Sequence, residues 1–371
     1  MTTSDREARM GLCALETMGS APLAAAVEEF GAVEVWRGLL AQRDGGPLSR
    51  KAAQVDVVEV QRATVRCGAR FLIPSDDEWP PALSDLRGAR VSSQTGPPLG
   101  LWVRGEPLHR LGEAVAVVGA RACTSYGEQV AVTLAADLAA EGSLIVSGLA
   151  FGIDAAAHRG ALGVGGMTLA VVASGLDDPY PSANSRLAEA VIRSGALASE
   201  LPPGSRPTRY AFLARNRIIA ALAGAVVVVE ASNRSGAKNT ASWALAMGRP
   251  VMAVPGPITS SLSATPHRLI RDAEAVLVTS AKDISALLAP VGSLPEATGR
   301  GGRRPIDTLA PHLREIREAV RSREEVTAAQ LAARTGQTML DTLANAAELV
   351  ESGWLADGEG GTFRLPGRSS R

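Results

Sequence analysis

The chain has 371 residues, of which 46% are hydrophobic and 20% are charged, as is typical of a globular protein with two or three domains. Its 38 lysines and arginines equal its 38 aspartates and glutamates. This balance excludes the overall positive charge of a strongly basic nucleic-acid-binding protein, so binding of that kind would require a local basic patch.

The remaining composition predicts a cytoplasmic protein. Cys13, Cys67 and Cys123 form no Cys-x-x-Cys pair and no spaced set with the four histidines, so we expect reduced thiols and no metal site. The polar start of the chain is unlike a signal peptide. No stretch approaches about 18 uninterrupted apolar residues, so we expect no membrane span.

The first part of the chain, residues 1–65, carries helical spacing and few strand signals, which predicts a small helical domain. Residues 18–22 resemble the turn of a helix-hairpin-helix, but no basic cluster lies near them, so we favour a packing role over DNA contact. The short apolar runs at 71–74 and 101–103 are bounded by prolines. We expect these runs to be edge strands or packing arms of a sheet.

The central part of the chain alternates short apolar runs with helix-length segments. Seven such runs occur, at residues 115–119, 144–147, 168–174, 196–199, 225–230, 251–254 and 275–278. Continuous apolar runs are typical of strands buried on both faces, so the sequence predicts an α/β fold with a doubly wound, mostly parallel sheet. Ligands bind at the carboxyl ends of such strands. We therefore expect six strand ends to form one crevice: 119–121, 147–148, 174–175, 199–200, 230–232 and 255–256.

The last part of the chain follows a segment rich in Gly and Pro, residues 291–305, which predicts a linker. Beyond it, helical segments at 312–320, 327–334 and 338–352 precede a hairpin at 354–365. This order predicts a winged helix-turn-helix. The sequence thus predicts a helical domain (1–65), an α/β domain (66–290), a linker (291–305) and a winged-helix domain (306–371).

The third helix of the predicted winged helix occupies the position that reads DNA in such domains. It carries Asp341, Asn345, Glu348 and Glu351 and neither Lys nor Arg. A helix that reads base edges needs cations for phosphates. We therefore favour protein contact or packing over groove reading.

Common catalytic motifs are missing from the sequence. There is no P-loop, no G-x-G-x-x-G after the first strand, no H-E-x-x-H and no G-x-S-x-G, so we expect neither a cofactor nor catalysis. His158 follows Asp154 by four residues, so on a helix the two would share a face. We favour a structural Asp154–His158 pair, with a general base as the alternative.

Positive charge is concentrated in one stretch. Between residues 204 and 238 six cations stand against Glu230 alone, a local balance of plus five. Arg121 should reach the same crevice, and small residues such as Ser147, Ser235 and Gly236 expose backbone amides beside it. A crevice that spans several strand ends favours single-stranded nucleic acid over one small phosphate. The alternative is that Arg215 and Arg217 form structural ion pairs.

The motifs around these positions resemble the DNA-processing protein A family, called DprA or Smf. They are Val-Gly-Ala-Arg at 118–121, Ser-Gly-Leu-Ala-x-Gly-Ile-Asp at 147–154 with His158, Gly-Leu-Asp-x-x-Tyr-Pro-x-x-Asn at 175–184, Ser-Glu-x-Pro-x-Gly at 199–204, Arg-Asn-Arg-Ile-Ile at 215–219 and Ala-Val-Pro-Gly at 253–256.

This resemblance implies a cytosolic homodimer with an extended Rossmann-like core. Members of the family bind single-stranded DNA without sequence preference, protect incoming strands in natural transformation, help load the RecA recombinase and have no established catalysis. Carried over to this chain, the DNA contacts are Arg121, Ser147, Gly148, Arg215, Asn216, Arg217, Ser235, Gly236 and Lys238. The residues expected to support the crevice are Gly119, Gly152, Asp154, His158, Tyr180 and Asn184.

Some positions depart from the family pattern. Phe151 stands where the family usually has Lys or Arg, and Lys238 replaces an apolar residue and could compensate. Two alternatives stay open at this point. One is a Rossmann-like enzyme that cleaves a nucleoside monophosphate with Glu230 or Asp154. The other is a protein-interaction module without DNA binding.

Overall fold

The computed structural model describes residues 3–42, 45–110, 113–289 and 305–366. The chain divides into two compact units, residues 1–293 and 294–371. The predicted linker at 291–305 falls almost entirely outside the described residues. Within the described residues, no helix combines the length and the apolar character needed to cross a lipid bilayer.

The first unit is built on a nine-stranded sheet with the order β1-β4-β8-β7-β6-β5-β9-β10-β11. The strands from β8 to β11 in this order are mutually parallel, whereas β1 and β4 are antiparallel to their neighbours. The bounds are β1 (Arg70–Leu72), β4 (Leu101–Gly105), β5 (Ala114–Val118), β6 (Leu144–Ser147), β7 (Thr168–Val172), β8 (Ala196–Ser199), β9 (Ala225–Val228), β10 (Val251–Ala253) and β11 (Val276–Leu277). The predicted α/β class and mostly parallel sheet are confirmed. The run at 101–103 is not an edge strand, because β4 lies between β1 and β8.

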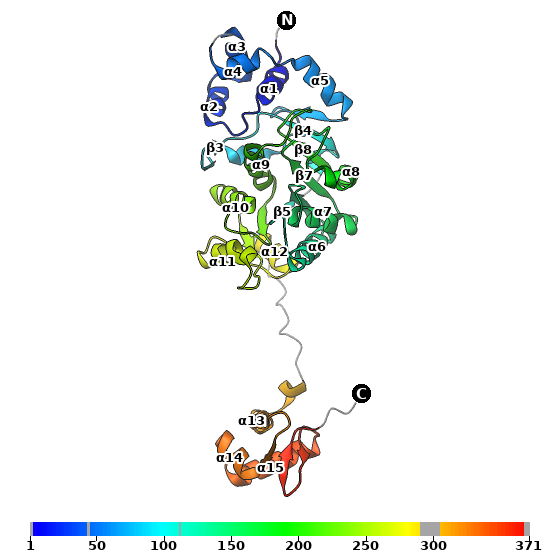
Figure 1. Cartoon of the computed structure of the whole chain (residues 1–371), viewed down its shortest axis with the longest axis vertical. Helices are drawn as coiled ribbons and strands as arrows, with labels where there is room; N and C mark the ends of the chain where they lie inside the picture. The colour runs from blue at the N-terminus through cyan, green and yellow to red at the C-terminus, as the bar shows by residue number, and fades with distance from the viewer. Residues whose placement is uncertain (1–2, 43–44, 111–112, 290–304, 367–371) are drawn as a thin grey trace. The chain divides into compact units, whose positions relative to one another are not determined.

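Helices cover both faces of this sheet (Figure 1). They are α6 (Ser125–Ala140), α7 (Ile153–Gly163), α8 (Ser185–Ser194), α9 (Arg209–Leu222), α10 (Gly236–Ala246), α11 (Ala264–Arg271) and α12 (Ala281–Leu288). Along β5, Val115 and Val117 pack with α6, α7 and α12, while Ala116 and Val118 pack with α9 and α10. Successive side chains of a strand point to opposite faces, so a continuous apolar run is what a sheet covered on both faces requires.

The chain order of the strands reverses at one place in the sheet. From β5 the chain proceeds through β6, β7 and β8 on one side, and β9, β10 and β11 then extend the sheet on the other side. The strands that follow β5 in the chain therefore extend the sheet to one side, and those from β9 onward extend it to the other, with the reversal between β5 and β9. This is the topological switch point at which open α/β sheets bind ligands.

Within the described residues, five α-helices precede β1 and pack in the same compact unit. They are α1 (Asp5–Cys13), α2 (Ala21–Phe30), α3 (Ala32–Ala41), α4 (Pro47–Ala52) and α5 (Val57–Arg66). Trp102 of β4 is fully buried and donates from its indole nitrogen to Thr64 of α5 at 2.8 Å.

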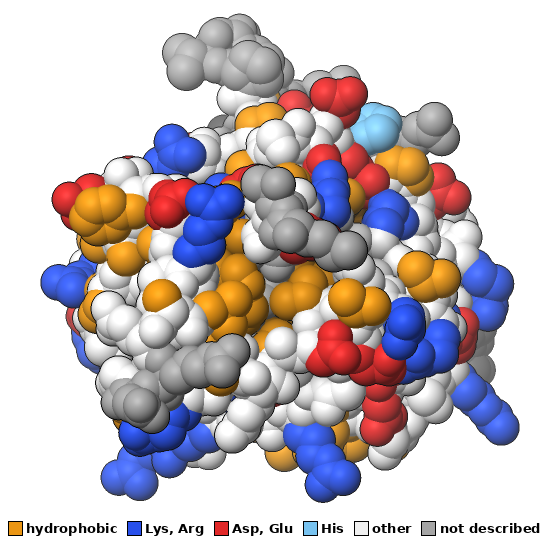
Figure 2. Space-filling view, turned by 90° about the horizontal axis from the view of Figure 1, so that it is seen from above, with side chains coloured by type: hydrophobic (Ala, Val, Ile, Leu, Met, Phe, Trp, Pro, Cys, Tyr) orange, Lys and Arg blue, Asp and Glu red, His pale blue; other side chains and the backbone are white. Residues whose placement is uncertain are grey.

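Figure 2 views the end of the unit nearest the N-terminus, where basic and acidic side chains surround an apolar centre. The visible part of this face therefore carries mixed charge.

The described part of the second unit contains three α-helices and a three-stranded antiparallel sheet. The helices are α13 (Pro311–Ala319), α14 (Ala328–Thr335) and α15 (Met339–Glu351), and the strands β12 (Glu325–Thr327), β13 (Ala356–Asp357) and β14 (Thr362–Arg364) pair in the order β12-β14-β13. Leu313, Ile316, Leu331 and Leu349 form its core. Three helices followed by a hairpin constitute a winged-helix arrangement.

Candidate nucleic-acid interface

A crevice of about 620 Å³ lies at the switch point of the sheet. Its walls come from the loop after β5, the start of α7, one face of α9 and the loop between β9 and α10. The charged and polar residues that line it are Arg121, Asp154, Arg209, Arg215, Asn216, Ser232, Arg234, Ser235 and Thr240. Four arginines against one carboxylate give this crevice a net positive charge, which suits an anion.

The face of α9 follows helical spacing. Arg209, Phe212, Asn216 and Ile219 line the crevice, and these positions are separated by three, four and three residues. The helix begins after Thr208, whose hydroxyl accepts from the amide of Ala211 at 3.1 Å. Because 3.6 residues make one turn, these side chains form a single stripe along the helix.

The loop after β5 presents Arg121 at the rim of the crevice. Arg121 is exposed, and its guanidinium carbon lies 4.4 Å from the centroid of the Phe212 ring. This cation–π contact orients the guanidinium at the rim, and its planar fork of N–H donors suits an anion such as phosphate.

Glu230 holds that loop from beneath. Its carboxylate accepts from the amide of Thr124 at 2.8 Å and from the Thr124 hydroxyl at 2.6 Å. The backbone amide of Ala120 donates to the Glu230 carbonyl at 2.6 Å, and that of Ile153 donates to the Ala120 carbonyl at 3.2 Å. The strand ends of β5, β6 and β9 are therefore fixed to one another by hydrogen bonds. The side chain of Glu230 is 2% exposed and does not line the crevice.

Arg215 lies at the floor of the crevice. Its side chain is nearly buried and donates to the carbonyl of Val171 at 2.5 Å. Burial lowers the pKa of Arg215 to about 10, with a further lowering by the charge of Arg121 and an opposing effect of Asp154. The group therefore stays protonated at neutral pH and supplies a fixed positive charge below the opening.

Asp154 is also largely buried. Burial raises the pKa of its carboxyl group, whereas Arg215 and the backbone amides of Ala150, Gly119 and Gly148 lower it. Amides that donate to a carboxylate favour its charged form. Asp154 thus binds together the loops after β5 and β6 and is the one carboxylate among the described lining residues.

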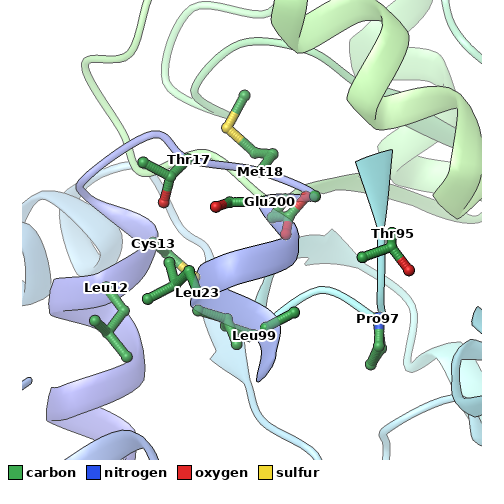
Figure 3. A pocket seen from close by; sticks show the side chains of 12 residues that line it. Leu12, Cys13, Thr17, Met18, Leu23, Thr95, Pro97, Leu99 and Glu200 are labelled. Carbon is green, nitrogen blue, oxygen red and sulfur yellow. The ribbon is translucent and has the colours of Figure 1, made fainter. Parts of the chain in front are cut away.

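A second cavity lies between the N-terminal helices and the segment that leads into β4. Figure 3 shows Leu12, Cys13, Met18 and Glu200 around it. Its volume is about 20 Å³, enough for a single water molecule and too small for a nucleotide. We therefore place the candidate interface at the larger crevice.

Comparisons with known proteins identify the family of this chain. The family model described as DNA recombination-mediator protein A matches residues 70–289. The chain belongs to this family. A DprA protein of Mycobacterium tuberculosis is 44% identical over 362 residues, covering 93% of this chain and 90% of that protein. Protein Smf of Escherichia coli is 40% identical over 299 residues, covering 79% of this chain and 77% of that protein.

Solved structures of the DprA family also resemble this chain. The crystal structure of DprA from Streptococcus pneumoniae has a TM-score of 0.64 at 33% identity and covers 77% of this chain and 98% of its own. The structure of DprA from Helicobacter pylori, described for its single-stranded DNA binding mode, has a TM-score of 0.52 at 28% identity and covers 59% of this chain and 95% of its own.

Several DprA motif residues line the crevice as the sequence placed them. Arg121, Gly119, Arg215 and Asn216 all contribute to its wall, as do Asp154, Ser235 and Gly236. The Asn216 amide donates to the carbonyl of Gly236 at 3.2 Å and to the side chain of Asn239 at 3.3 Å. It thereby joins α9 to the start of α10, where Ser235 accepts from the amide of Ala237.

Arg217 requires a correction. Its side chain is 0% exposed and forms two 2.7 Å bonds to the carboxylate of Glu200, with further donation to the carbonyls of Gly96 and Ala214. The prediction that Arg217 contacts DNA is therefore corrected: Arg217 forms a structural ion pair, which was the alternative. Arg217 points away from the crevice because it lies two residues after Arg215 on the same helix, about 200° around its axis.

His158 also differs from the expectation. Its Nδ1 lies 2.7 Å from the Thr168 hydroxyl, whose own proton goes to the carbonyl of Ile145. The predicted pair with Asp154 does not form in the structure. Burial lowers the pKa of His158 to about 3, with a smaller contribution from the charge of Arg215. The ring is neutral and lies between α7 and β7 of the sheet, and it is not among the residues that line the crevice.

Ser147 and Gly148 lie beneath the crevice, outside its lining. The Ser147 hydroxyl is fully buried and donates to the carbonyl of Val117 at 2.7 Å. Gly148 packs against the guanidinium of Arg215. Gly152 has φ 72° and ψ −126°, a region that only glycine adopts readily, and a Cβ there would overlap the backbone of residues 120 and 121. These three residues shape the floor and are not among the residues that line the crevice.

The remaining predicted residues lie at the edge of the site or away from it. Lys238 is exposed on α10, and Phe151 is 45% exposed; neither is among the residues that line the crevice. Asn184 is buried and donates to the carbonyl of Leu149 at 2.9 Å. Tyr180 is 43% exposed, and its ring centroid lies 5.8 Å from that of Phe212.

The crevice also differs from the sequence prediction in its extent. It is lined from the ends of β5, β6 and β9, while the predicted ends at 174–175, 199–200 and 255–256 are not among its lining residues. Arg209 and Arg234 line it but were not singled out as contacts. Arg209 could have been found from its helical spacing to Asn216. Arg234 could have been found from its place before the Ser235 helix cap.

Proposed function

We propose that this chain binds single-stranded DNA without sequence preference, with Arg121, Arg209 and Arg234 as its exposed phosphate contacts. The observation that carries this proposal is the convergence of arginines from three separate segments on one crevice of about 620 Å³. Arg215 adds a fixed charge at the floor. The crevice is lined from the ends of three strands, which suits a run of phosphates better than a single one.

The aromatic residues support a single-stranded ligand. Phe212 and Tyr180 lie beside each other at the rim, and Arg121 stacks on the Phe212 ring. Unpaired bases stack on such rings and on guanidinium planes, whereas the bases of a duplex are already stacked on one another. The single-stranded DNA binding mode described for Helicobacter pylori DprA supports the same choice.

The two alternatives receive less support from the geometry. In the nucleotide-cleaving enzyme, Glu230 or Asp154 would act on a substrate. Both Glu230 oxygens accept hydrogen bonds from Thr124, and the Asp154 carboxylate accepts backbone amides. A pure interaction module would not require four arginines around a deep crevice.

We also propose that the chain acts as a recombination mediator that protects single strands and helps load a RecA-type recombinase. The family description supports the mediator role. Assembly of the recombinase on single strands coated with a single-strand-binding protein tests the loading step. Faster assembly in the presence of this chain is expected, and an unchanged rate would contradict it.

We propose in addition that the chain forms a homodimer through the edge strand β11. Val276 and Leu277 are 49% and 47% exposed there, and β11 pairs only with β10 among the described strands. An apolar edge strand is prone to pair with another chain. A sedimentation mass of two chains that becomes one on Val276→Lys would support this interface.

The DNA-binding proposal is tested by a fluorescence-anisotropy titration with a single-stranded oligonucleotide and its duplex at two salt concentrations. We expect preferential binding of the single strand, weakened by salt and by Arg121→Ala. Arg193→Ala, which removes an exposed arginine of α8 outside the crevice, is the matched control. Equal binding of both DNA forms, or an Arg121→Ala variant that binds like the control, would contradict the proposal.

A further inference from the structure

The described part of the C-terminal unit carries no excess of positive charge. Residues 306–366 contain ten acidic residues, six arginines and no lysine, a formal balance of minus four, whereas over the whole unit, residues 294–371, eleven arginines balance eleven acidic residues. A winged helix that holds DNA needs cations at its recognition helix and wing to neutralise phosphates. The charge of residues 306–366 therefore does not favour a duplex ligand.

The distribution of that charge is more informative than its sum. On α15, the helix in the recognition position, Asp341, Glu348 and Glu351 are exposed. At the tip of the wing Asp357 and Glu359 are exposed as well. Both elements that would enter DNA grooves thus present carboxylates, and phosphates would be repelled from each of them.

The polar side chain of α15 that could read a base is already engaged. The Asn345 amide donates to the side-chain oxygen of Gln337 at 2.8 Å, and Gln337 in turn donates to the carbonyl of His312 at 3.0 Å. These bonds connect α15 to α13 and stabilise the unit internally. Asn345 is consequently not free to form a bidentate contact with adenine.

The outer face of α15 is apolar. Leu340 is 79% exposed and Leu343 is 45% exposed, and the exposed Ala344 and Ala347 continue the same stripe at spacings of three, four and seven residues from Leu340. The opposite face of the helix packs on the core through Thr342, Ala346 and Leu349. The helix therefore has a second apolar face beyond the one that folding uses.

We propose that this outer face docks a protein partner whose apolar surface is edged by lysines or arginines. We define the α15 face as Leu340, Leu343, Ala344 and Ala347, with Asp341 and Glu348 along one edge and Glu351 at the C-terminal end of the stripe. An exposed helix with apolar residues at i, i+3, i+4 and i+7 fits a hydrophobic groove, and these carboxylates select a groove with a basic rim.

Repulsion between like charges also makes a second copy of this chain an unfavourable partner. Two α15 helices packed antiparallel would place Asp341 of one near Glu348 and Glu351 of the other. Parallel packing would place each carboxylate near its own counterpart. Both arrangements bring like charges together, which disfavours self-pairing.

The test uses the full chain and a fluorescent synthetic helical peptide made of leucine and lysine, with leucines on one face and lysines on its flanks. Binding is followed by anisotropy, and its salt dependence is recorded. We expect saturable binding that weakens by about tenfold or more in Leu340→Ser/Leu343→Ser, because truncation of buried anchor residues has effects of this size. The variant Glu348→Lys/Glu351→Lys should lose binding as well.

The matched control is Val58→Ser/Val65→Ser, which removes two exposed valines of α5, 52% and 76% exposed, in the other unit. Peptide affinity should stay within about twofold of the parent in this control, as surface changes outside an interface are near neutral. The charge-reversal variant keeps the apolar stripe, so it tests recognition even if the serine variant perturbs folding.

Four results would overturn the proposal. The peptide could fail to bind, or it could bind the parent and both α15 variants equally. Duplex DNA could bind the full chain in a manner that the α15 changes abolish. Finally, sedimentation could reveal self-association that depends on Leu340 and Leu343, which would make a second copy the occupant. None of these outcomes depends on single-stranded DNA binding at the crevice.

Discussion

The backbone of Gly148 lies directly against the guanidinium of Arg215. A Cβ at residue 148 would overlap that group, because the central carbon and Nη2 would lie 2.5 and 2.6 Å from it and Nη1 closer still, well short of van der Waals contact. The bond from Arg215 to the carbonyl of Val171 keeps the guanidinium in this position. The absence of a side chain at residue 148 therefore determines where the buried charge of the crevice floor lies.

Gly148→Ala should displace Arg215 and weaken single-stranded DNA binding. We also expect a loss of about 1–3 kcal/mol in the free energy of unfolding, as is typical of overpacked interiors. Gly38→Ala is the control: residue 38 lies in α3 with open space around its Cβ position, and alanine there should stabilise the helix by about 0.5–1 kcal/mol. Urea unfolding and anisotropy measure both effects. An alanine at 148 that changes neither quantity would contradict the packing described.

Arg217→Ala should reduce stability far more than any exposed arginine does. It leaves Glu200 as an unpaired carboxylate in the interior, and loss of one partner of a buried pair costs about 3–5 kcal/mol. Arg217→Met/Glu200→Leu should recover part of that loss, because the unpaired charge is removed too. Thermal unfolding is the measurement, with Arg193→Ala as the control. If Arg217→Ala unfolds like the parent and only weakens DNA binding, Arg217 is a DNA contact after all.

Stability should fall on acidification through His158. Its pKa is lowered to about 3 by burial, so between the usual pKa of 6.5 and about 3 the unfolded chain binds a proton that the folded chain does not. Stability rises with pH where the unfolded state binds more protons, here by up to about 1.4 kcal/mol per pH unit. Asp154 has the opposite sign, since its pKa is raised and acidification relieves its burial.

The comparison of His158→Gln with the parent isolates this contribution. The difference between their unfolding free energies should change with pH between 6.5 and about 3, and the parent should show the steeper loss toward low pH. Chemical denaturation at several pH values between 7 and 4 measures it. Parallel pH profiles for the two proteins would show that folding does not lower the pKa of His158 and would contradict this prediction.

The sequence was sufficient to predict the sheet, because the signal for each strand lies in a few consecutive residues. Each strand of the parallel region is a continuous apolar run, and the parallel order follows from the helix-length segments between runs. The crevice was harder to define because it depends on which strands are neighbours. The switch point between β5 and β9 selects the ends near Arg121 and Arg234 and leaves those near Ser174 and Pro255 outside.

The roles of the side chains on α9 depend on their angular positions around the helix. Arg215 and Arg217 are equivalent in a list of cations, yet a helix turns them to opposite sides, one to the crevice and the other to Glu200. The stripe formed by Arg209, Phe212 and Asn216 follows from the same geometry. His158 could not be assigned from spacing, because its partner Thr168 lies on another element, β7.

The most direct test of the account is the salt dependence of single-stranded DNA binding by the variant Arg121→Ala/Arg209→Ala/Arg234→Ala. Each phosphate contact contributes about 0.7 to the slope of log affinity against log salt for single strands, so the slope should become shallower by about two. The control Arg50→Ala/Arg87→Ala/Arg193→Ala removes three exposed arginines outside the crevice and should keep the parental slope. A crevice variant that retains the parental slope and affinity, or a control that loses them equally, would contradict the account.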